Sequence, residues 1–155
     1  IILGYSLLIW LLVIKGGGDI QQHIESVMYG ENIRSPESSQ LQIVESENQI
    51  NLAISATENS DKLLVIKFYA DWCVSCNKLE RIVFSNSNVV HALQSTLALT
   101  ADVTANNKDN QQILARFNLV GPPAILFFKD GKEQRSHRII GEISATDFLK
   151  HINNL

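Results

Sequence analysis

The feature that most constrains the fold is an apolar run, residues 63–70, which leads into the segment Trp72-Cys73-Val74-Ser75-Cys76 and the only two cysteines of the 155-residue chain. A strand that delivers Cys-x-x-Cys to the first turn of a helix places one sulfur over unpaired N–H groups, where the helix dipole favours thiolate over thiol. The spacing i, i+3 on a helix also brings two Cα atoms to roughly 5 Å, a separation that a disulfide closes without strain. The pattern therefore predicts a redox centre in which Cys73 and Cys76 cycle between dithiol and disulfide.

Two other interpretations of the cysteine pair have less support. A structural zinc site needs four ligands, usually from a second Cys-x-x-Cys or a closely spaced histidine pair, whereas the four histidines of this chain are scattered. A purely structural disulfide would stabilise the fold little, because the stabilisation grows with the length of the closed loop. We therefore expect no metal and no organic cofactor.

The first residues of the chain suggest a membrane. Residues 1–14 are almost entirely apolar and stop at Lys15-Gly16-Gly17-Gly18. Because a bilayer span needs about 20 residues, the pattern favours the end of a transmembrane helix over residues 1–15, followed by a polar linker over residues 16–40. A signal peptide is a competing interpretation, but the run lacks a basic n-region and a cleavage site. A buried core helix is a further alternative.

Residues 41–155 have the size of one domain. Apolar patterning alternates between strands and helices, which implies an α/β fold with a mixed central sheet and helices on both of its faces. The formal net charge of −3 gives no basic patch, so nucleic acid is not an expected partner. We expect strands over residues 41–44, 63–70, 97–103, 124–128 and 135–140, with a turn at Asp130-Gly131. We expect helices over residues 47–57, from the cysteines to about residue 84, from Asn86 or Ser87 through residue 93, over residues 107–117, and after Ser144.

The chain resembles the thioredoxin superfamily in three segments: residues 67–80, which contain Tyr-Ala-Asp-Trp-Cys-x-x-Cys; residues 101–106, Ala-Asp-Val-Thr-Ala-Asn; and residues 120–128, which contain Gly-Pro-Pro. Within that superfamily it is similar to one branch, the C-terminal periplasmic domains of the DsbD family of membrane thiol:disulfide interchange reductases. The resemblance covers about residue 41 to the end and implies a thioredoxin-like fold. The apolar N-terminal segment would match the last span of the family's membrane domain.

The resemblance also implies a function and a location. Electrons from cytosolic thioredoxin, and ultimately from NADPH, would cross a membrane-embedded domain and reach the Cys73-Cys76 pair. They would then pass to the other periplasmic domain of the same reductase and to further periplasmic thioredoxin-fold proteins. The chain would lie at the bacterial inner membrane, with residues 41–155 in the periplasm. Two alternatives stay open: a membrane-anchored thioredoxin-like protein that acts alone, for example in cytochrome c maturation, and a non-catalytic module for redox sensing or docking.

One departure from the family concerns charge beneath the cysteines. Six residues before the first cysteine, the family usually has a buried aspartate that helps to move the proton of the second cysteine, and this chain has Lys67. The family's other carboxylate in that role matches Glu80. Because one unpaired buried charge costs several kcal/mol, Lys67 is expected either to pair with Glu80 or to extend its amine to solvent.

The second departure concerns the proline segment. The resemblance makes Pro123 the cis proline that faces the cysteines, and the main chain of the residue before it would pair with a partner strand. Here that residue is Pro122, which has no N–H to donate. Asp71 and Trp72, which belong to the family motif, are expected to modulate the site together with Lys67 and Pro122.

Thiol chemistry assigns a role to each sulfur. Cys73, expected to be exposed, attacks a partner disulfide as thiolate, and Cys76, expected to be buried and of higher pKa, then attacks Cys73 and releases the reduced partner. Glu80 lies one helical turn beyond Cys76 and is the best candidate for the base that activates it.

Overall fold

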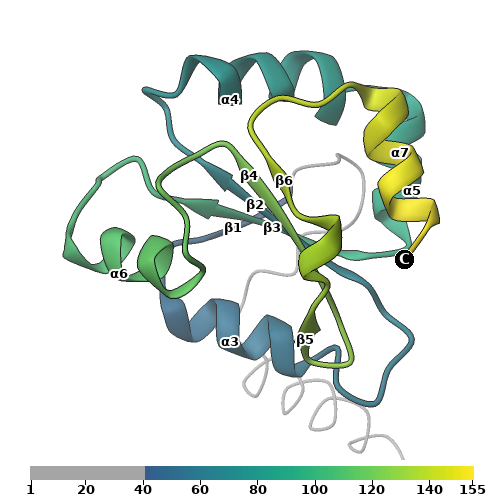
Figure 1. Ribbon diagram of the computed structural model, residues 1–155, viewed down its shortest axis with the longest axis horizontal. Helices are drawn as coiled ribbons and strands as arrows, with labels where there is room; N and C mark the ends of the chain where they lie inside the picture. The colour runs from purple at the N-terminus through teal and green to yellow at the C-terminus, as the bar shows by residue number, and fades with distance from the viewer. Residues whose placement is uncertain (1–40) are drawn as a thin grey trace, which may run out of the picture. The chain divides into compact units, whose positions relative to one another are not determined.

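Strands and helices alternate along residues 41–155, the part of the chain that the computed structural model describes (Figure 1). The predicted end of a membrane helix over residues 1–15 and the linker over 16–40 lie outside the described residues. Within residues 41–155, no helix has both the length and the apolar character needed to cross a membrane. The strands are β1 (Gln42–Val44), β2 (Leu64–Tyr69), β3 (Leu97–Asp102), β4 (Ala124–Lys129), β5 (Lys132–Glu133) and β6 (Ile139–Ile140); the helices are α3 (Glu47–Ser55), α4 (Val74–Leu79), the π-helix η1 (Glu80–Phe84), α5 (Ser87–Gln94), α6 (Lys108–Arg116), the 3-10 helix η2 (Arg135–His137) and α7 (Ala145–Asn153).

The strands form one mixed sheet. Their order is β1-β3-β2-β4-β5, and β6 also pairs with β4. β1 and β2 run parallel to β3, whereas β4 runs antiparallel to β2. The predicted mixed central sheet is therefore confirmed, with β2, the strand that leads to the cysteines, between two neighbours.

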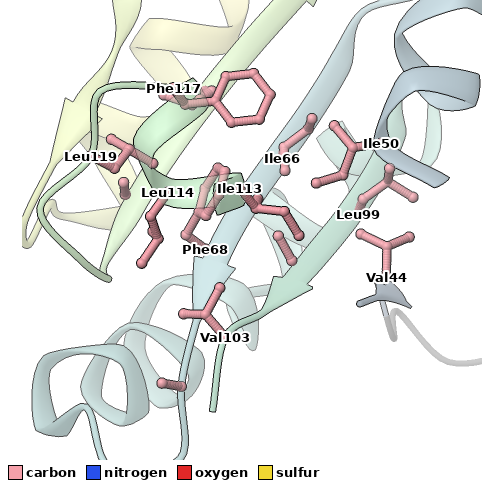
Figure 2. Close-up of a cluster of buried hydrophobic side chains, with 14 of the residues drawn as sticks. Val44, Ile50, Ile66, Phe68, Leu99, Val103, Ile113, Leu114, Phe117 and Leu119 are labelled. Carbon is pink, nitrogen blue, oxygen red and sulfur yellow. The ribbon is translucent and has the colours of Figure 1, made fainter. Parts of the chain in front are cut away.

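Helices cover both faces of this sheet, as predicted. Figure 1 shows α3 and α6 on one side of the strands and α4, α5 and α7 on the other. Side chains alternate along β2: Ile66 and Phe68 pack in the cluster formed with α3 and α6, and Val65 in the cluster formed with the other helices. Figure 2 shows the first cluster, in which the labelled residues are Val44, Ile50, Ile66, Phe68, Leu99, Val103, Ile113, Leu114, Phe117 and Leu119.

The predicted helix starts are confirmed where polar side chains cap them. The Asn86 side-chain oxygen accepts from the backbone N–H groups of Asn88 and Val89, which makes Asn86 rather than Ser87 the cap of α5. The Ser144 hydroxyl accepts from the N–H of Asp147 at the start of α7. These caps fix where each helix begins and hence how its apolar face meets the sheet.

The turn after β4 also follows the sequence prediction. Asp130 and Gly131 have φ of 51° and 69°, and they join two strand residues that pair directly, Lys129 and Lys132. Two consecutive residues with positive φ form a type I′ turn, which suits the twist of a hairpin and explains the Asp-Gly sequence.

The prediction of one strand over residues 135–140 is wrong. The chain leaves the ladder after β5, makes the three-residue turn η2 and returns to β4 only at Ile139 and Ile140. A salt bridge accounts for this excursion: Arg138 binds both carboxylate oxygens of Glu133, through Nε and, at 2.9 Å, through Nη2. The contact holds the two ends of the turn together, so the local charge pair overrides the strand pattern.

Candidate active site

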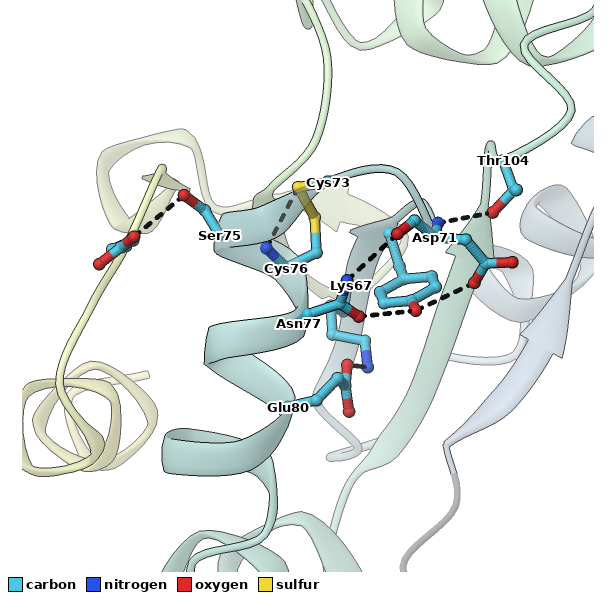
Figure 3. Close-up of a disulfide and its surroundings, with 10 residues drawn as sticks. Lys67, Asp71, Cys73, Ser75, Cys76, Asn77, Glu80 and Thr104 are labelled. Atoms are coloured by element: carbon cyan, nitrogen blue, oxygen red, sulfur yellow. Dashed lines mark hydrogen bonds and ion pairs between the residues drawn. A yellow bond between two sulfur atoms is a disulfide. The ribbon is translucent and has the colours of Figure 1, made fainter.

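The two cysteines meet at the start of α4, as the sequence predicts. Cys73 is the N-cap of this helix, and its sulfur accepts a hydrogen bond of 3.1 Å from the backbone N–H of Cys76 (Figure 3). The two residues form a disulfide with Cα atoms 5.2 Å apart. The same N–H that contacts the sulfur in the disulfide can stabilise a thiolate after reduction.

Cys73 is buried in this disulfide state, whereas the sequence predicts an exposed sulfur for the reduced form. Cys73 is 7% exposed and Cys76 is 2% exposed. The contact with the Cys76 N–H and the bond to the Cys76 sulfur hold the side chain of Cys73 back over the first turn of the helix. Its sequence neighbours Trp72 and Val74 are exposed instead, at 56% and 82%.

A polar network fixes the turn that precedes Cys73. The backbone N–H of Asp71 donates to the hydroxyl of Thr104 at 3.0 Å, and the Trp72 ring N–H donates to the Thr104 carbonyl at 3.0 Å. From α4, the Asn77 side chain donates to the Asp71 carbonyl at 3.1 Å. The Tyr69 hydroxyl lies 3.0 Å from the Asp71 carboxylate and 3.1 Å from the Asn77 side-chain oxygen. Asp71 and Trp72 therefore act here as anchors that tie the redox turn to α4 and to the loop after β3.

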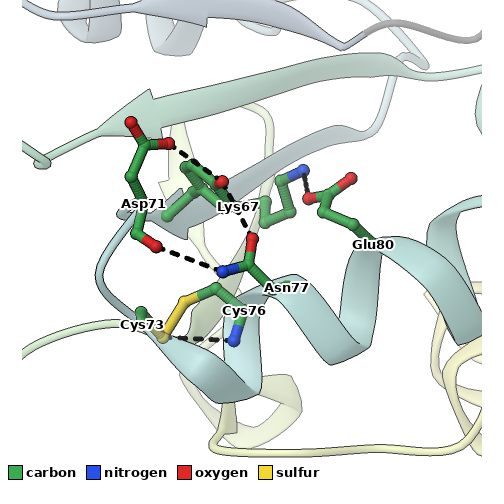
Figure 4. Close-up of polar contacts among 7 residues, drawn as sticks. Lys67, Asp71, Cys73, Cys76, Asn77 and Glu80 are labelled. Carbon is green, nitrogen blue, oxygen red and sulfur yellow. Dashed lines mark hydrogen bonds and ion pairs between the residues drawn. A yellow bond between two sulfur atoms is a disulfide. The ribbon is translucent and has the colours of Figure 1, made fainter.

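The side chain of Lys67, on β2, lies between that strand and the cysteine helix, and its amine forms an ion pair with Glu80 (Figure 4). The side chain of Lys67 is 7% exposed and that of Glu80 is 38% exposed. The amine also lies 4.6 Å from the centre of the Phe84 ring, a cation–π contact. Burial lowers the pKa of Lys67, and Glu80 opposes that shift. Of the two arrangements expected for this lysine, the structure has the ion pair.

Glu80 stands at a change of helix type. It is the C-cap of α4 and the first residue of the π-helix η1. In this π-helix, the N–H of Ser85 donates to the Glu80 carbonyl at 3.0 Å. The sequence predicts one regular helix to about residue 84, so the wider turn is a correction. π-turns are rare and often occur at functional sites, and this one lies where Glu80 reaches across to Lys67.

The proline segment lies at the same end of the sheet as the cysteines. Ala124 at the start of β4 pairs with Phe68 near the end of β2, so Pro123 lies at the edge from which the chain leads to Cys73. The Pro122–Pro123 peptide bond is cis. The resemblance that makes Pro123 the proline of the site thus agrees with its position in the sheet.

One contact at the site was not predicted. Glu142, in the loop between β6 and α7, accepts hydrogen bonds from Ser75 Oγ at 2.9 Å and from Lys78 Nζ at 2.5 Å. Hydrogen bonds from Lys78 first and Ser75 second lower the pKa of Glu142. Ser75 lies between the two cysteines, yet Glu142 follows it by 67 positions in the sequence, so no local pattern in the sequence could have linked them.

The arrangement as a whole is that of a disulfide exchange centre. A family model named thioredoxin matches residues 43–154. The chain belongs to the thioredoxin family. Exchange in this family is carried by the cysteine pair itself, and within residues 41–155 no cluster of three or more metal-binding side chains occurs. A thioredoxin-family fold with a Cys73-Cys76 disulfide at the start of α4 indicates a disulfide oxidoreductase.

Within the thioredoxin family, the chain is similar in sequence to thiol:disulfide interchange proteins named DsbD. The chain is 37% identical over 139 residues to the thiol:disulfide interchange protein DsbD of Ralstonia nicotianae, an alignment that covers 88% of this chain and 23% of that protein. It is 44% identical over 94 residues to DsbD of Yersinia pestis, covering 60% of this chain and 16% of that protein. The chain thus spans less than a quarter of the length of these relatives.

The chain is also similar in structure to a solved DsbD domain. The C-terminal domain of Neisseria meningitidis DsbD in its reduced form superposes with a TM-score of 0.63 at 26% identity, over 73% of this chain and 98% of that domain. The oxidised form of that domain superposes with a TM-score of 0.62. The predicted resemblance to the C-terminal domains of the DsbD family is therefore confirmed.

Proposed function

We propose that this chain is the terminal dithiol domain of a membrane reductase. In this proposal, the Cys73-Cys76 pair receives electrons from a membrane-embedded domain of the same protein and passes them to disulfides of periplasmic thioredoxin-fold partners. The observation that carries the proposal is the superposition on nearly the whole of a DsbD C-terminal domain, with a cysteine pair at the start of α4. The apolar character of residues 1–14 supports a connection to a membrane span.

The transfer of electrons follows from thiol chemistry. The Cys73 thiolate attacks one sulfur of a partner disulfide, and the other partner sulfur leaves as a thiolate. Cys76 loses its proton and attacks Cys73, which re-forms the Cys73-Cys76 disulfide and releases a partner with two thiols. Two electrons thus pass to the partner, and two must return through the membrane domain for the next cycle.

We propose that Glu80 accepts the proton of Cys76 in this second step. Glu80 follows Cys76 by four residues on the same helical segment, and a base near the resolving thiol accelerates its attack. Lys67 holds the carboxylate through the ion pair and keeps it from being an unbalanced negative charge close to the sulfurs. Pro123 and Pro122 contribute the backbone edge on which a partner strand would lie, with only the Pro122 carbonyl available as a hydrogen-bonding group.

Vesicles test the electron relay directly. They would enclose thioredoxin, thioredoxin reductase and NADPH and carry in their membrane the full-length gene product that contains this chain. We expect the Cys73-Cys76 disulfide, exposed on the outer side, to become reduced when NADPH is enclosed and to stay oxidised without it. Alkylation of the free thiols, read as a mass shift, measures the reduced fraction.

The matched control carries only the 155 residues of this chain in the same vesicles. The proposal expects this short protein to stay oxidised, because it lacks the domain that conducts electrons across the membrane. Equal reduction of the short and full-length proteins would contradict the relay and support a membrane-anchored protein that acts alone.

A further inference from the structure

The loop between β6 and α7 contacts both sides of the site. The backbone N–H of Gly141 donates to the Pro123 carbonyl at 2.9 Å, and the side chain of the next residue, Glu142, binds Ser75 and Lys78 on α4. We propose that Glu142 is a positioning residue for partner exchange, which holds the first turn of α4 at a fixed spacing from the proline segment. This inference rests on the proposed function, because the spacing matters only when a folded partner docks against both segments.

A carboxylate is well suited to this position. Its two oxygens take different partners: Oε1 accepts from the Ser75 hydroxyl at 2.9 Å, and Oε2 accepts from the Lys78 amine at 2.5 Å. Figure 3 shows the contact with Ser75 on the opposite side of α4 from Lys67 and Glu80. A glutamine has only one acceptor oxygen and no charge, so Glu142→Gln removes the ion pair and at least weakens one of the two contacts.

The contact is too exposed to be explained by stability. The side chains of Lys78 and Glu142 are 52% and 43% exposed, and exposed ion pairs contribute little to the free energy of folding. Their geometric effect is larger, because Ser75 lies between the two cysteines in the sequence and the Gly141 N–H donates to the Pro123 carbonyl. A small misplacement of a reacting group can lower a rate by about 10²-fold. Loss of the contacts of Glu142 with Ser75 and Lys78 therefore affects partner docking more than folding.

The test compares a protein disulfide with a small one. Insulin must dock before its disulfide meets Cys73, whereas the uncharged hydroxyethyl disulfide needs only the sulfur. The quantity compared is the rate constant for reduction of insulin divided by that for hydroxyethyl disulfide. We expect Glu142→Gln to lower this ratio by about tenfold. A displacement of the docking segments by part of an ångström should cost less than the roughly 10²-fold loss that a misplacement of about 1 Å causes. The lower ratio should persist at about 1 M salt, where the Debye length is about 3 Å and charge steering is screened.

Two further variants make the result interpretable. Ser75→Ala removes the hydrogen bond from Ser75 to Glu142 but keeps the ion pair with Lys78, and it is expected to lower the same ratio by a smaller factor. Glu47→Gln breaks the ion pair between Glu47 and Arg116, whose side chains are 48% and 33% exposed and lie on α3 and α6, and it should leave the ratio unchanged.

Each other outcome counts against the inference. An unchanged ratio in Glu142→Gln, or equal losses with both disulfides, would mean that Glu142 does not position a docked partner. A loss that disappears at high salt would make Glu142 a steering charge instead. A wild-type chain that reduces hydroxyethyl disulfide but not insulin would contradict this inference, and one that reduces neither disulfide would overturn the proposed function as well.

Discussion

Cys76→Ser should accumulate as a mixed disulfide between Cys73 and a partner, and its turnover should fall below detection. Cys73 is the N-cap of α4 and receives the N–H of Cys76, so it is the sulfur better placed to react as a thiolate. Cys76, 2% exposed, is the resolving sulfur, and serine cannot replace it. Peptide mapping after alkylation identifies the trapped bond.

The matched control is Cys73→Ser, which keeps Cys76 intact. We expect it to trap little or no partner, because its remaining sulfur is the more buried of the two. A mixed disulfide on Cys76 in this variant, formed with a yield equal to that on Cys73 in Cys76→Ser, would reverse the assigned roles.

Glu80→Gln should destabilise the oxidised domain more than Lys67→Met does. Removing one partner of a buried ion pair costs about 3–5 kcal/mol, because the other charge is left without a partner. Glu80→Gln leaves the 7% exposed amine unpaired, whereas Lys67→Met leaves a carboxylate that is 38% exposed and can be hydrated. We expect losses of about 3 kcal/mol and about 1 kcal/mol, the second discounted for that exposure. Urea unfolding of both variants and of the double variant measures them; equal losses would contradict the asymmetry.

The same ion pair predicts a pH dependence. Burial lowers the pKa of Lys67 from its ordinary 10.5, so between the lowered value and 10.5 the unfolded chain binds more protons than the folded one. The free energy of unfolding of the wild type, relative to Lys67→Met, must then rise with pH across that alkaline window. Tyr69 has a raised pKa and titrates in the opposite sense, but it is present in both proteins and cancels in the comparison.

Reactivity of the cysteines gives a second view of Lys67. A positive charge close to the sulfurs favours the thiolate, so Lys67→Met should raise the apparent pKa of Cys73, and Glu80→Gln should mainly slow the attack by Cys76. Alkylation rates followed against pH measure the first effect. Superimposable curves for wild type and Lys67→Met would mean that this lysine does not act on the sulfurs.

Local patterns carried most of the fold prediction. The apolar run before Cys73, the caps at Asn86 and Ser144 and the Asp130-Gly131 turn each depend on neighbours within a few residues, and each appears where it was expected. The predicted strand over residues 135–140 failed because a charge pair between Glu133 and Arg138 folds the segment out of the ladder. A pattern of apolar residues carries no information about such a pair.

At the site, the sequence could not predict contacts between residues that are far apart in the chain. Motif spacing was enough to find Cys73 and Cys76, and the family resemblance together with helical geometry suggested Glu80. The contact of Glu142 with Ser75 depends on how distant segments pack, and it has no local signature in the sequence. Lys67 is an intermediate case. The sequence shows that a lysine replaces the aspartate usual in the family, but only the packing shows that its amine pairs with Glu80 and does not extend to solvent.

The reduction potential of the Cys73-Cys76 pair tests the central claim most directly. The chain would be equilibrated with buffers of reduced and oxidised dithiothreitol or glutathione, and the disulfide fraction would be measured by alkylation. A reductase that passes electrons to partner disulfides should have a potential near that of thioredoxin, about −270 mV, and below the roughly −180 mV of a disulfide isomerase. A value near −120 mV, typical of a strong oxidant such as DsbA, would mean that the pair accepts electrons from partners, and would contradict the proposed direction.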